Sequence, residues 1–397
     1  MNLKLQVRIA FGYFFIIALL GVLLRSFQVF DVSFTYKYLV HTHSHVALLG
    51  WIYTALTSLI YHLYLSDKSI DKKYTRLFWF TQITIVGMMV TFPIKGYALF
   101  SIVFSTLFLF TSYAFTRMFL KHTSEEQKQT QSYKIIRAAL WFMVLSSIGP
   151  WALGYIMNTL GSTSAWYRNA IYFYLHFQYN GWFLLAICGL LFYFLEMKQL
   201  QLPKHLFKWF YEFLILGVFL TFTLSILWME PTFVFYIIAG IGAILQLIAF
   251  GIFYLNVYSK REEFSTVFSS KTITIFIIVA ILLDIKLTSQ LLGSFPKIAH
   301  YVSNNVDLVI SYIHLVFLGI ISLSIIAFYH QLRIIRITKA SIIVYTSGFI
   351  ATESLLIYKG LASRIPGLYY SYLFIASIIL CIGIALFFFQ VFKRETE

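Results

Sequence analysis

The sequence predicts an all-α polytopic membrane protein with twelve transmembrane helices. Of its 397 residues, 60% are hydrophobic, 20% are aromatic and only 11% are charged, and the mean hydropathy is +0.81. A soluble domain has about 25% charged residues, so this deficit alone indicates a membrane protein. Long apolar runs separated by short polar segments support the same class.

Twelve apolar runs are long enough to cross a bilayer, whose core of about 30 Å requires about 20 residues of helix. They lie near 8–29, 40–65, 77–94, 97–116, 138–158, 170–195, 207–229, 232–257, 272–293, 307–330, 341–360 and 369–391. We therefore expect a single transmembrane domain over residues 1–397 and no soluble catalytic domain.

Lysine and arginine are concentrated in every second loop. With twelve spans, one side of the membrane holds 22 of the 30 Lys and Arg residues, including those at 66–76 and 117–137 and the tail residues Lys393 and Arg394. The positive-inside rule then places both termini in the cytoplasm and the protein in the cytoplasmic (inner) membrane. The pI near 9.6 does not indicate nucleic-acid binding, because the cations lie in short clusters between apolar runs.

A histidine, four residues and a glycine recur in three of the expected spans. The pairs are His45 with Gly50, His176 with Gly181, and His314 with Gly319. The histidines are 131 and 138 residues apart, and each offset covers four helices, so they fall at similar depth in the second, sixth and tenth spans. This predicts three pseudo-symmetric four-helix units. The units are approximately 1–125, 130–262 and 270–397. Each glycine leaves room for a flat ligand or a neighbouring backbone.

Histidines inside a bilayer are costly and by default indicate a functional site. The densest group is His41, His43 and His45 in the second span. At 100° per residue, His41 and His45 share a helix face and His43 points to the other side. Two histidines from different helices suit a bis-His haem, and three ring nitrogens suit copper or zinc.

The stretch from His43 to Trp51, His-Ser-His-Val-Ala-Leu-Leu-Gly-Trp, resembles the His-x-His helix of the haem–copper oxidase subunit I superfamily. The likeness is greatest to its cbb-type oxidase and nitric oxide reductase branch. The stretch is also similar to the His-x-His-Glu-Met-Leu-Phe-Gly segment of the NnrS family, whose members contain haem and copper. The superfamily has twelve helices in three pseudo-symmetric groups of four, with metal-binding histidines on helices 2, 6 and 10. The resemblance is to a divergent branch of this superfamily, because the chain departs from the respiratory oxidases in two spans.

The resemblance implies a b-type haem held by His45 and His314. It implies that His176 binds a second metal such as copper, with His43 and, less directly, His41 as candidates for a second metal or haem. Redox chemistry or the handling of a diatomic gas, nitric oxide or oxygen, would follow; as an enzyme, the protein would be a haem-dependent oxidoreductase. The electron donor and any partner subunit stay open.

The chain departs from the respiratory oxidases in two spans. The run at 207–229 lacks the histidine pair that binds copper there, and the tenth span has Tyr312-Ile-His314 in place of their His-x-His. Their high-spin haem site is therefore not implied. Asn180 and Tyr179 are near enough to His176 to hydrogen-bond its imidazole or a bound gas.

Two other functions stay open. Asp284, Lys286 and Glu353 lie inside spans, which favours as the alternative a secondary transporter or proton-coupled carrier. Asp284 and Lys286 are two residues apart and do not share a helix face, so each is expected either to bond to neighbouring helices or to belong to a proton path. A zinc-dependent intramembrane enzyme is a weaker alternative, because the sequence has no His-Glu-x-x-His.

Overall fold

The computed structural model of the chain describes residues 1–66, 69–362 and 364–392. Within those ranges it contains twelve helical spans that are long and apolar enough to cross a membrane, and no β-strand. Each apolar run of the sequence corresponds to one span, so the predicted fold class, an all-α polytopic membrane protein, is confirmed. Lys68 and the tail residues Lys393 and Arg394, which contributed to the predicted topology, lie outside the described residues.

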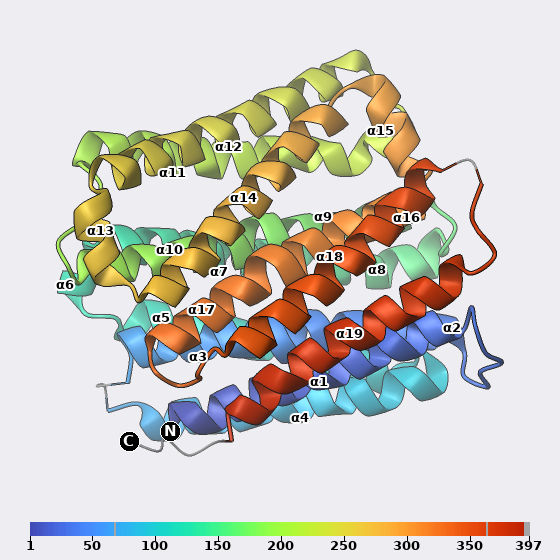
Figure 1. Cartoon of the computed structure of the whole chain (residues 1–397), viewed down its shortest axis with the longest axis horizontal. Helices are drawn as coiled ribbons and strands as arrows, with labels where there is room; N and C mark the ends of the chain where they lie inside the picture. The colour runs from blue at the N-terminus through green and yellow to red at the C-terminus, as the bar shows by residue number, and fades with distance from the viewer. Residues whose placement is uncertain (67–68, 363, 393–397) are drawn as a thin grey trace. The chain divides into compact units, whose positions relative to one another are not determined.

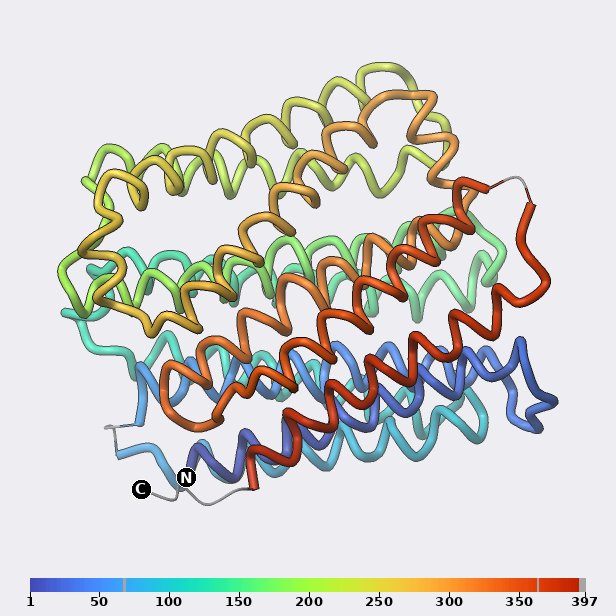
Figure 2. The backbone as a smooth tube through the Cα atoms, in the orientation of Figure 1, coloured from blue at the N-terminus to red at the C-terminus, as the bar shows by residue number. Residues whose placement is uncertain are grey.

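The helices gather into two compact units, Met1–Thr123 with Ile325–Glu397 (unit 1) and Ser124–Ser324 (unit 2). Figures 1 and 2 show the course of the chain through them. Unit 1 contains α1 (Leu3–Ser26), α2 (Tyr36–His45), η1 (Val46–Tyr53), α3 (Thr54–Tyr64), α4 (Asp71–Lys95), α5 (Leu99–His122), most of α17 (Leu323–Gln331), α18 (Lys339–Leu361) and α19 (Tyr369–Gln390).

Unit 2 contains the middle of the chain. Its elements are α6 (Glu125–Lys128), α7 (Gln131–Ser146), α8 (Ile148–Thr159), α9 (Ala165–His176), η2 (Phe177–Phe183), α10 (Leu184–Glu196), α11 (Lys204–Thr221), η3 (Phe222–Met229), α12 (Phe233–Ser259), α13 (Arg261–Val267), α14 (Ser270–Gly293), α15 (Pro296–Ser303), α16 (Val306–His314) and η4 (Leu315–Ser322). This division follows packing contacts and does not test the three sequence repeats, which stay a prediction.

Small residues bring helices of unit 1 into close contact. The two chain ends lie side by side as α1 and α19, with Phe15 stacked on Phe388 at 5.4 Å between ring centroids (Figure 1). Next to them, Gly348 of α18 is so near α19 that a Cβ on it would lie 2.4 Å from the backbone nitrogen of Leu380. Glycine at such positions allows two backbones to approach, which is how helices commonly associate in membranes.

Unit 2 uses the same kind of contact. A Cβ on Gly242 of α12 would lie 2.8 Å from the backbone nitrogen of Thr221 in α11, and one on Gly217 of α11 would lie 3.0 Å from the carbonyl oxygen of Gly242. Helices α11 and α12 therefore pack backbone to backbone. This close pairing positions the polar side chains of both helices next to each other inside the unit.

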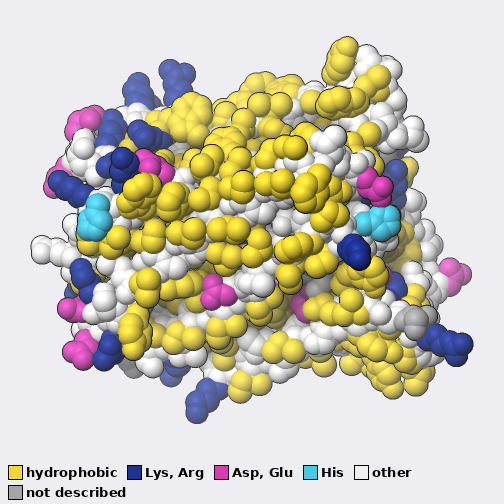
Figure 3. All heavy atoms as spheres, turned by 90° about the horizontal axis from the view of Figure 1, so that it is seen from above, with side chains coloured by type: hydrophobic (Ala, Val, Ile, Leu, Met, Phe, Trp, Pro, Cys, Tyr) yellow, Lys and Arg dark blue, Asp and Glu magenta, His cyan; other side chains and the backbone are white. Residues whose placement is uncertain are grey.

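The surface has the distribution expected of a chain that crosses a bilayer. On the face drawn in Figure 3, hydrophobic side chains cover the middle of the helices, and most Lys and Arg side chains lie toward the helix ends.

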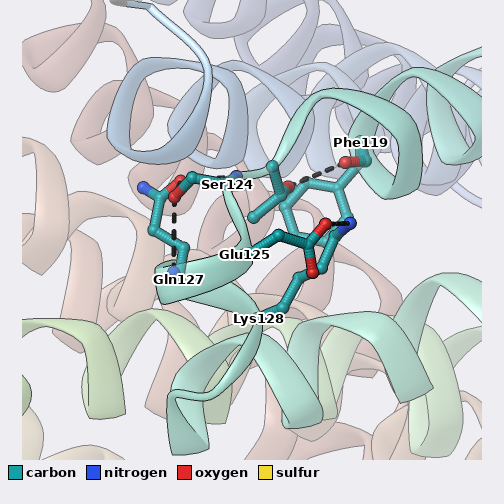
Figure 4. Close-up of polar contacts among 6 residues, drawn as sticks. Phe119, Ser124, Glu125, Gln127 and Lys128 are labelled. Carbon is teal, nitrogen blue, oxygen red and sulfur yellow. Dashed lines mark hydrogen bonds and ion pairs between the residues drawn. The ribbon is translucent and has the colours of Figure 1, made fainter.

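The polar loop after α5 is drawn in Figure 4. There Ser124 and Gln127 form a capping box at α6, and Lys128 lies 2.6 Å from the Glu125 carboxylate, whose hydrogen bond raises the pKa of Lys128.

Candidate functional site

Each repeated histidine is the last residue of an α-helix and is followed at once by a π-helix. The α-helices ending in this way are α2 at His45, α9 at His176 and α16 at His314, and the π-helices that follow are η1, η2 and η4. Each π-helix contains its repeat glycine. A π-helix is defined by i→i+5 hydrogen bonds, and five is the spacing from histidine to glycine. In the described part of the chain π-helix occurs only in these three places.

This coincidence supports the sequence repeat with an independent, structural property. π-Helices are rare, and they occur frequently at functional sites. The α-helices before the three histidines have 10, 12 and 9 residues. At 1.5 Å per residue, each histidine lies about 14–18 Å along its span, so the three occupy similar positions in their helices, and their equal depth in the membrane stays a prediction.

The spans with the repeated histidines are also the most enclosed. Buried residues make up 83% of the apolar stretch in spans 2 and 6 and 56% in span 10, against 33–39% in the remaining described spans. A helix that is apolar all round and buried belongs to the protein interior rather than to the lipid-facing surface. Side chains of spans 2, 6 and 10 therefore face protein on most sides.

Aromatic side chains of the preceding span occupy the space beside the repeat glycines of spans 2 and 6. A Cβ on Gly50 would lie 2.9 Å from Cγ of Tyr13 in α1, and one on Gly181 would lie 2.6 Å from Cβ of Phe142 in α7. Of the two expected uses, the structure therefore shows close helix packing at these positions and no open slot for a flat ligand. The same relation in both repeats is a second structural likeness between them.

His45 has one ring nitrogen engaged by the backbone and the other directed at a side chain. Its Nδ1–H donates to the carbonyl oxygen of His41 at 2.8 Å, so Nε2 carries the lone pair. The Tyr97 hydroxyl lies 3.3 Å from that Nε2, and the Phe92 ring packs on the imidazole with 4.4 Å between centroids. A histidine whose Nδ1–H is held by a carbonyl and whose Nε2 is a base has the tautomer typical of metal-binding histidines.

The other two histidines of the cluster lie on opposite sides of α2. His41 packs edge-on against Tyr97, with 4.7 Å between centroids, on the same side as His45. His43 lies against α1, where its Cε1 is 3.5 Å from the position of a Cβ on Gly21. The predicted division of the cluster into two faces is confirmed. Accordingly, the described residues contain no group of three or more His, Cys, Asp or Glu side chains close enough to hold a metal ion.

His176 is completely engaged by protein groups. Its Nε2–H donates to the carbonyl oxygen of Val218 at 2.8 Å, and its Nδ1 accepts from the Asn180 side-chain amide at 3.1 Å. His176 is 2% exposed. The expected hydrogen bond from Asn180 to the imidazole is therefore present. In this arrangement neither ring nitrogen of His176 is free to bind a metal.

A chain of buried hydrogen bonds continues from His176 to a lysine inside the membrane span α14. The Asn180 carbonyl oxygen accepts from the Gln290 amide at 3.5 Å, and the Gln290 oxygen accepts from Lys286 Nζ at 2.8 Å. Lys286 Nζ also donates to the Gln246 oxygen of α12 at 3.3 Å, and the Gln246 amide donates to the Thr221 hydroxyl at 2.9 Å. All of these residues are less than 6% exposed.

The network shows how the charged residues of α14 are placed. Lys286 bonds to an amide of the neighbouring helix α12 and to one on its own helix, as expected for a lysine held by packing partners. Asp284 takes no part in the network and is exposed on α14.

The remaining predicted residues are divided between the two units. Glu353 is buried on α18 in unit 1. His314 is half-buried in unit 2, whereas His45 belongs to unit 1.

Sequence reasoning missed Tyr97 beside His45, and it missed Thr221 and Gln246 of the buried network. Gln246 and Gln290 each interrupt a long apolar run, which is the signal that a polar side chain faces the interior. Tyr97 had no comparable signal, because it follows the end of α4.

Searches with the sequence find no matching family model and no curated protein of similar sequence. The resemblance to the haem–copper oxidase superfamily therefore stays a prediction. So do the haem, the second metal and the residue roles that the resemblance implies.

Proposed function

We propose that this protein is a haem-binding integral membrane protein that carries out redox chemistry or handles a diatomic gas, nitric oxide or oxygen. The supporting observation is that His45, His176 and His314 stand at equivalent junctions of α-helix and π-helix, in the most enclosed spans. His45 and His314 would hold the haem iron in this proposal.

The local chemistry of His45 fits an axial ligand. The bond from its Nδ1–H to the His41 carbonyl orients the ring and keeps Nε2 unprotonated, and Phe92 restricts the ring plane. The Tyr97 hydroxyl lies next to the same Nε2 and has to move aside for iron to bind. When bound, a haem held by both histidines would supply one-electron chemistry, and a gas molecule would reach the iron only in place of one of them. The chain then contributes the ligands, their orientation and an apolar surrounding.

His176 is not part of the proposed metal chemistry. Both of its ring nitrogens are hydrogen-bonded, and it is continuous with the buried network that ends at Lys286. A second metal such as copper stays a prediction for His43 and, on the opposite face of α2, for His41.

Absorption spectroscopy of the purified, haem-replete protein tests the proposal. We expect a Soret band and a pyridine haemochrome spectrum of b type, both lost in His45→Ala and in His314→Ala. His62→Ala and His330→Ala are matched controls, because these histidines lie near the opposite ends of the same two spans. Haem-free protein from haem-replete cells, or full haem content in both test variants, would refute the proposal.

A proton-coupled carrier is the second candidate, and the observation that favours it is the buried amine of Lys286 within a polar network crossing α14, α12, α11 and span 6. Intramembrane amines of this kind are common in transport pathways. Uptake of a substrate or of protons into liposomes by metal-free protein, abolished in Lys286→Met and retained in the exposed-site variant Asp284→Asn, would support it. Flux that is equal in wild type and in Lys286→Met would exclude this path.

A further inference from the structure

Unit 2 contains a partly open cavity of about 210 Å³ whose lining includes neither proposed haem ligand nor Lys286. It is bounded by span 6, by η3, by the end of α14, and by α15 and α16, at the end of the unit where α15 lies (Figure 1). His176 and Gln290 line it, and their polar atoms bond to other protein groups. Most of the remaining wall is aromatic or aliphatic.

Arg168 is the charged residue of this wall. Its guanidinium lies over the Trp228 ring at 4.1 Å and over the Tyr172 ring at 5.1 Å, and its Nε donates to the Tyr172 hydroxyl at 2.9 Å. These contacts hold the guanidinium in one position. Its two terminal amino groups have no carboxylate partner in the described part of the chain.

The lining includes no aspartate or glutamate, so the cavity has one full charge, and it is positive. Glu230, the residue that follows η3, is paired with His300 at 2.6 Å. A half-buried guanidinium is stabilised by an anion that forms charge-assisted, bidentate hydrogen bonds. The apolar wall favours a ligand whose remaining surface is also apolar.

The size of the cavity limits the ligand. A protein cavity of about 150 Å³ accommodates benzene. The present cavity is somewhat larger, which leaves room for a ring and one carboxylate. We propose that it binds a small, largely apolar monoanion of the aromatic monocarboxylate class, with Arg168 receiving the carboxylate. This inference does not depend on haem binding.

Titration calorimetry of the purified protein in detergent tests the ligand class with three probes. Benzoate has both required features, benzamide lacks the charge, and formate lacks the apolar body. We expect saturable 1:1 binding of benzoate, at least about tenfold weaker binding of benzamide, and no saturable binding of formate in the same concentration range. Equal binding of benzoate and benzamide, equal binding of benzoate and formate, or no saturable binding of benzoate would each overturn the proposal.

Two pairs of variants locate the binding. Arg168→Gln should weaken benzoate binding at least about tenfold and leave benzamide unchanged, whereas Lys297→Gln, at an exposed cation of α15 outside the lining, should leave both unchanged. Gly293→Leu places a side chain in the cavity at a position where a Cβ meets nothing nearer than 3.9 Å, so the protein should fold and lose benzoate binding.

Gly251→Leu is the matched control for the filled cavity. Gly251 also lies in a helix of unit 2, and a Cβ on it would meet no atom within 4 Å, but it does not line the cavity. Wild-type benzoate affinity in Arg168→Gln, or in correctly folded Gly293→Leu, would overturn the assignment. Benzoate binding that persists in haem-free His45→Ala separates this site from the haem proposal.

Discussion

The contact between Gly181 and Phe142 predicts that Gly181→Ala destabilises the protein although alanine is the better helix former. The new Cβ would lie 2.6 Å from Cβ and 2.7 Å from Cγ of Phe142, whereas carbon atoms pack at about 3.5–4.0 Å. Phe142 would have to move by about 1 Å. Because its Cβ is fixed to the backbone, no side-chain rotation relieves the contact, and α7 itself must shift.

Overpacking of this kind costs about 1–3 kcal/mol, and a rigid neighbour places the cost toward the upper end. The gain in helix propensity from glycine to alanine is about 1 kcal/mol. We therefore expect a net loss of about 1–2 kcal/mol for Gly181→Ala. Gly50→Ala should lose less, because its nearest contact, Tyr13 Cγ, is at 2.9 Å.

Unfolding by sodium dodecyl sulfate in mixed micelles, followed by circular dichroism, measures these differences. Gly251→Ala is the control: nothing lies within 4 Å of its Cβ position, so only the propensity gain applies and the variant should be stabilised by about 0.5–1 kcal/mol. The two substitutions should thus shift the midpoint in opposite directions. A stabilised Gly181→Ala would refute the reasoning that the repeat glycine exists for close packing.

Three further predictions concern the site and the topology. Tyr97→Phe removes the hydroxyl beside His45 Nε2, so haem content by pyridine haemochrome should be at least that of the wild type; loss of haem would count against His45 as a ligand. Asn180→Leu leaves two buried groups without their partner and should cost about 1–3 kcal/mol for each in the detergent titration, and an unchanged midpoint would contradict the network. Since both native cysteines are buried, an impermeant maleimide should label Lys297→Cys but not Gln127→Cys in intact cells; labelling of both would contradict cytoplasmic termini.

The fold was predictable because the bilayer imposes one dominant pattern. Twelve apolar runs of about 20 residues have few alternatives to membrane-spanning helices, and the structure places a helix at each. The faces of α2 were also predictable, since His41, His43 and His45 follow the 100° rotation of an α-helix. Helix geometry there depends only on positions close together in the chain.

The site was less predictable because it depends on neighbours that are distant in the sequence. Nothing near His176 indicates that the carbonyl oxygen of Val218, 42 residues later, occupies its Nε2. The π-helices were not foreseen either, although the spacing from histidine to glycine matches their hydrogen-bond pattern, because five-residue spacings have no signature in hydropathy. The side chains of Tyr13 and Phe142 beside the repeat glycines belong to other helices in the same way.

The hydrogen bonds that lead away from Lys286 all run in one direction, and this has a consequence for His176. An amine that meets two amide oxygens leaves each amide to offer its NH₂ group onward, so Gln290 donates to Asn180, Asn180 donates to the imidazole, and the imidazole proton is left on the nitrogen facing Val218. The tautomer of His176 is thereby favoured from both sides, because the Val218 carbonyl can only accept a hydrogen bond and the amide chain from Lys286 ends at Nδ1. Replacing that lysine by methionine would release the amides to turn, but Val218 would still hold the ring proton on Nε2, so the ¹⁵N chemical shifts of the His176 ring should report the same tautomer.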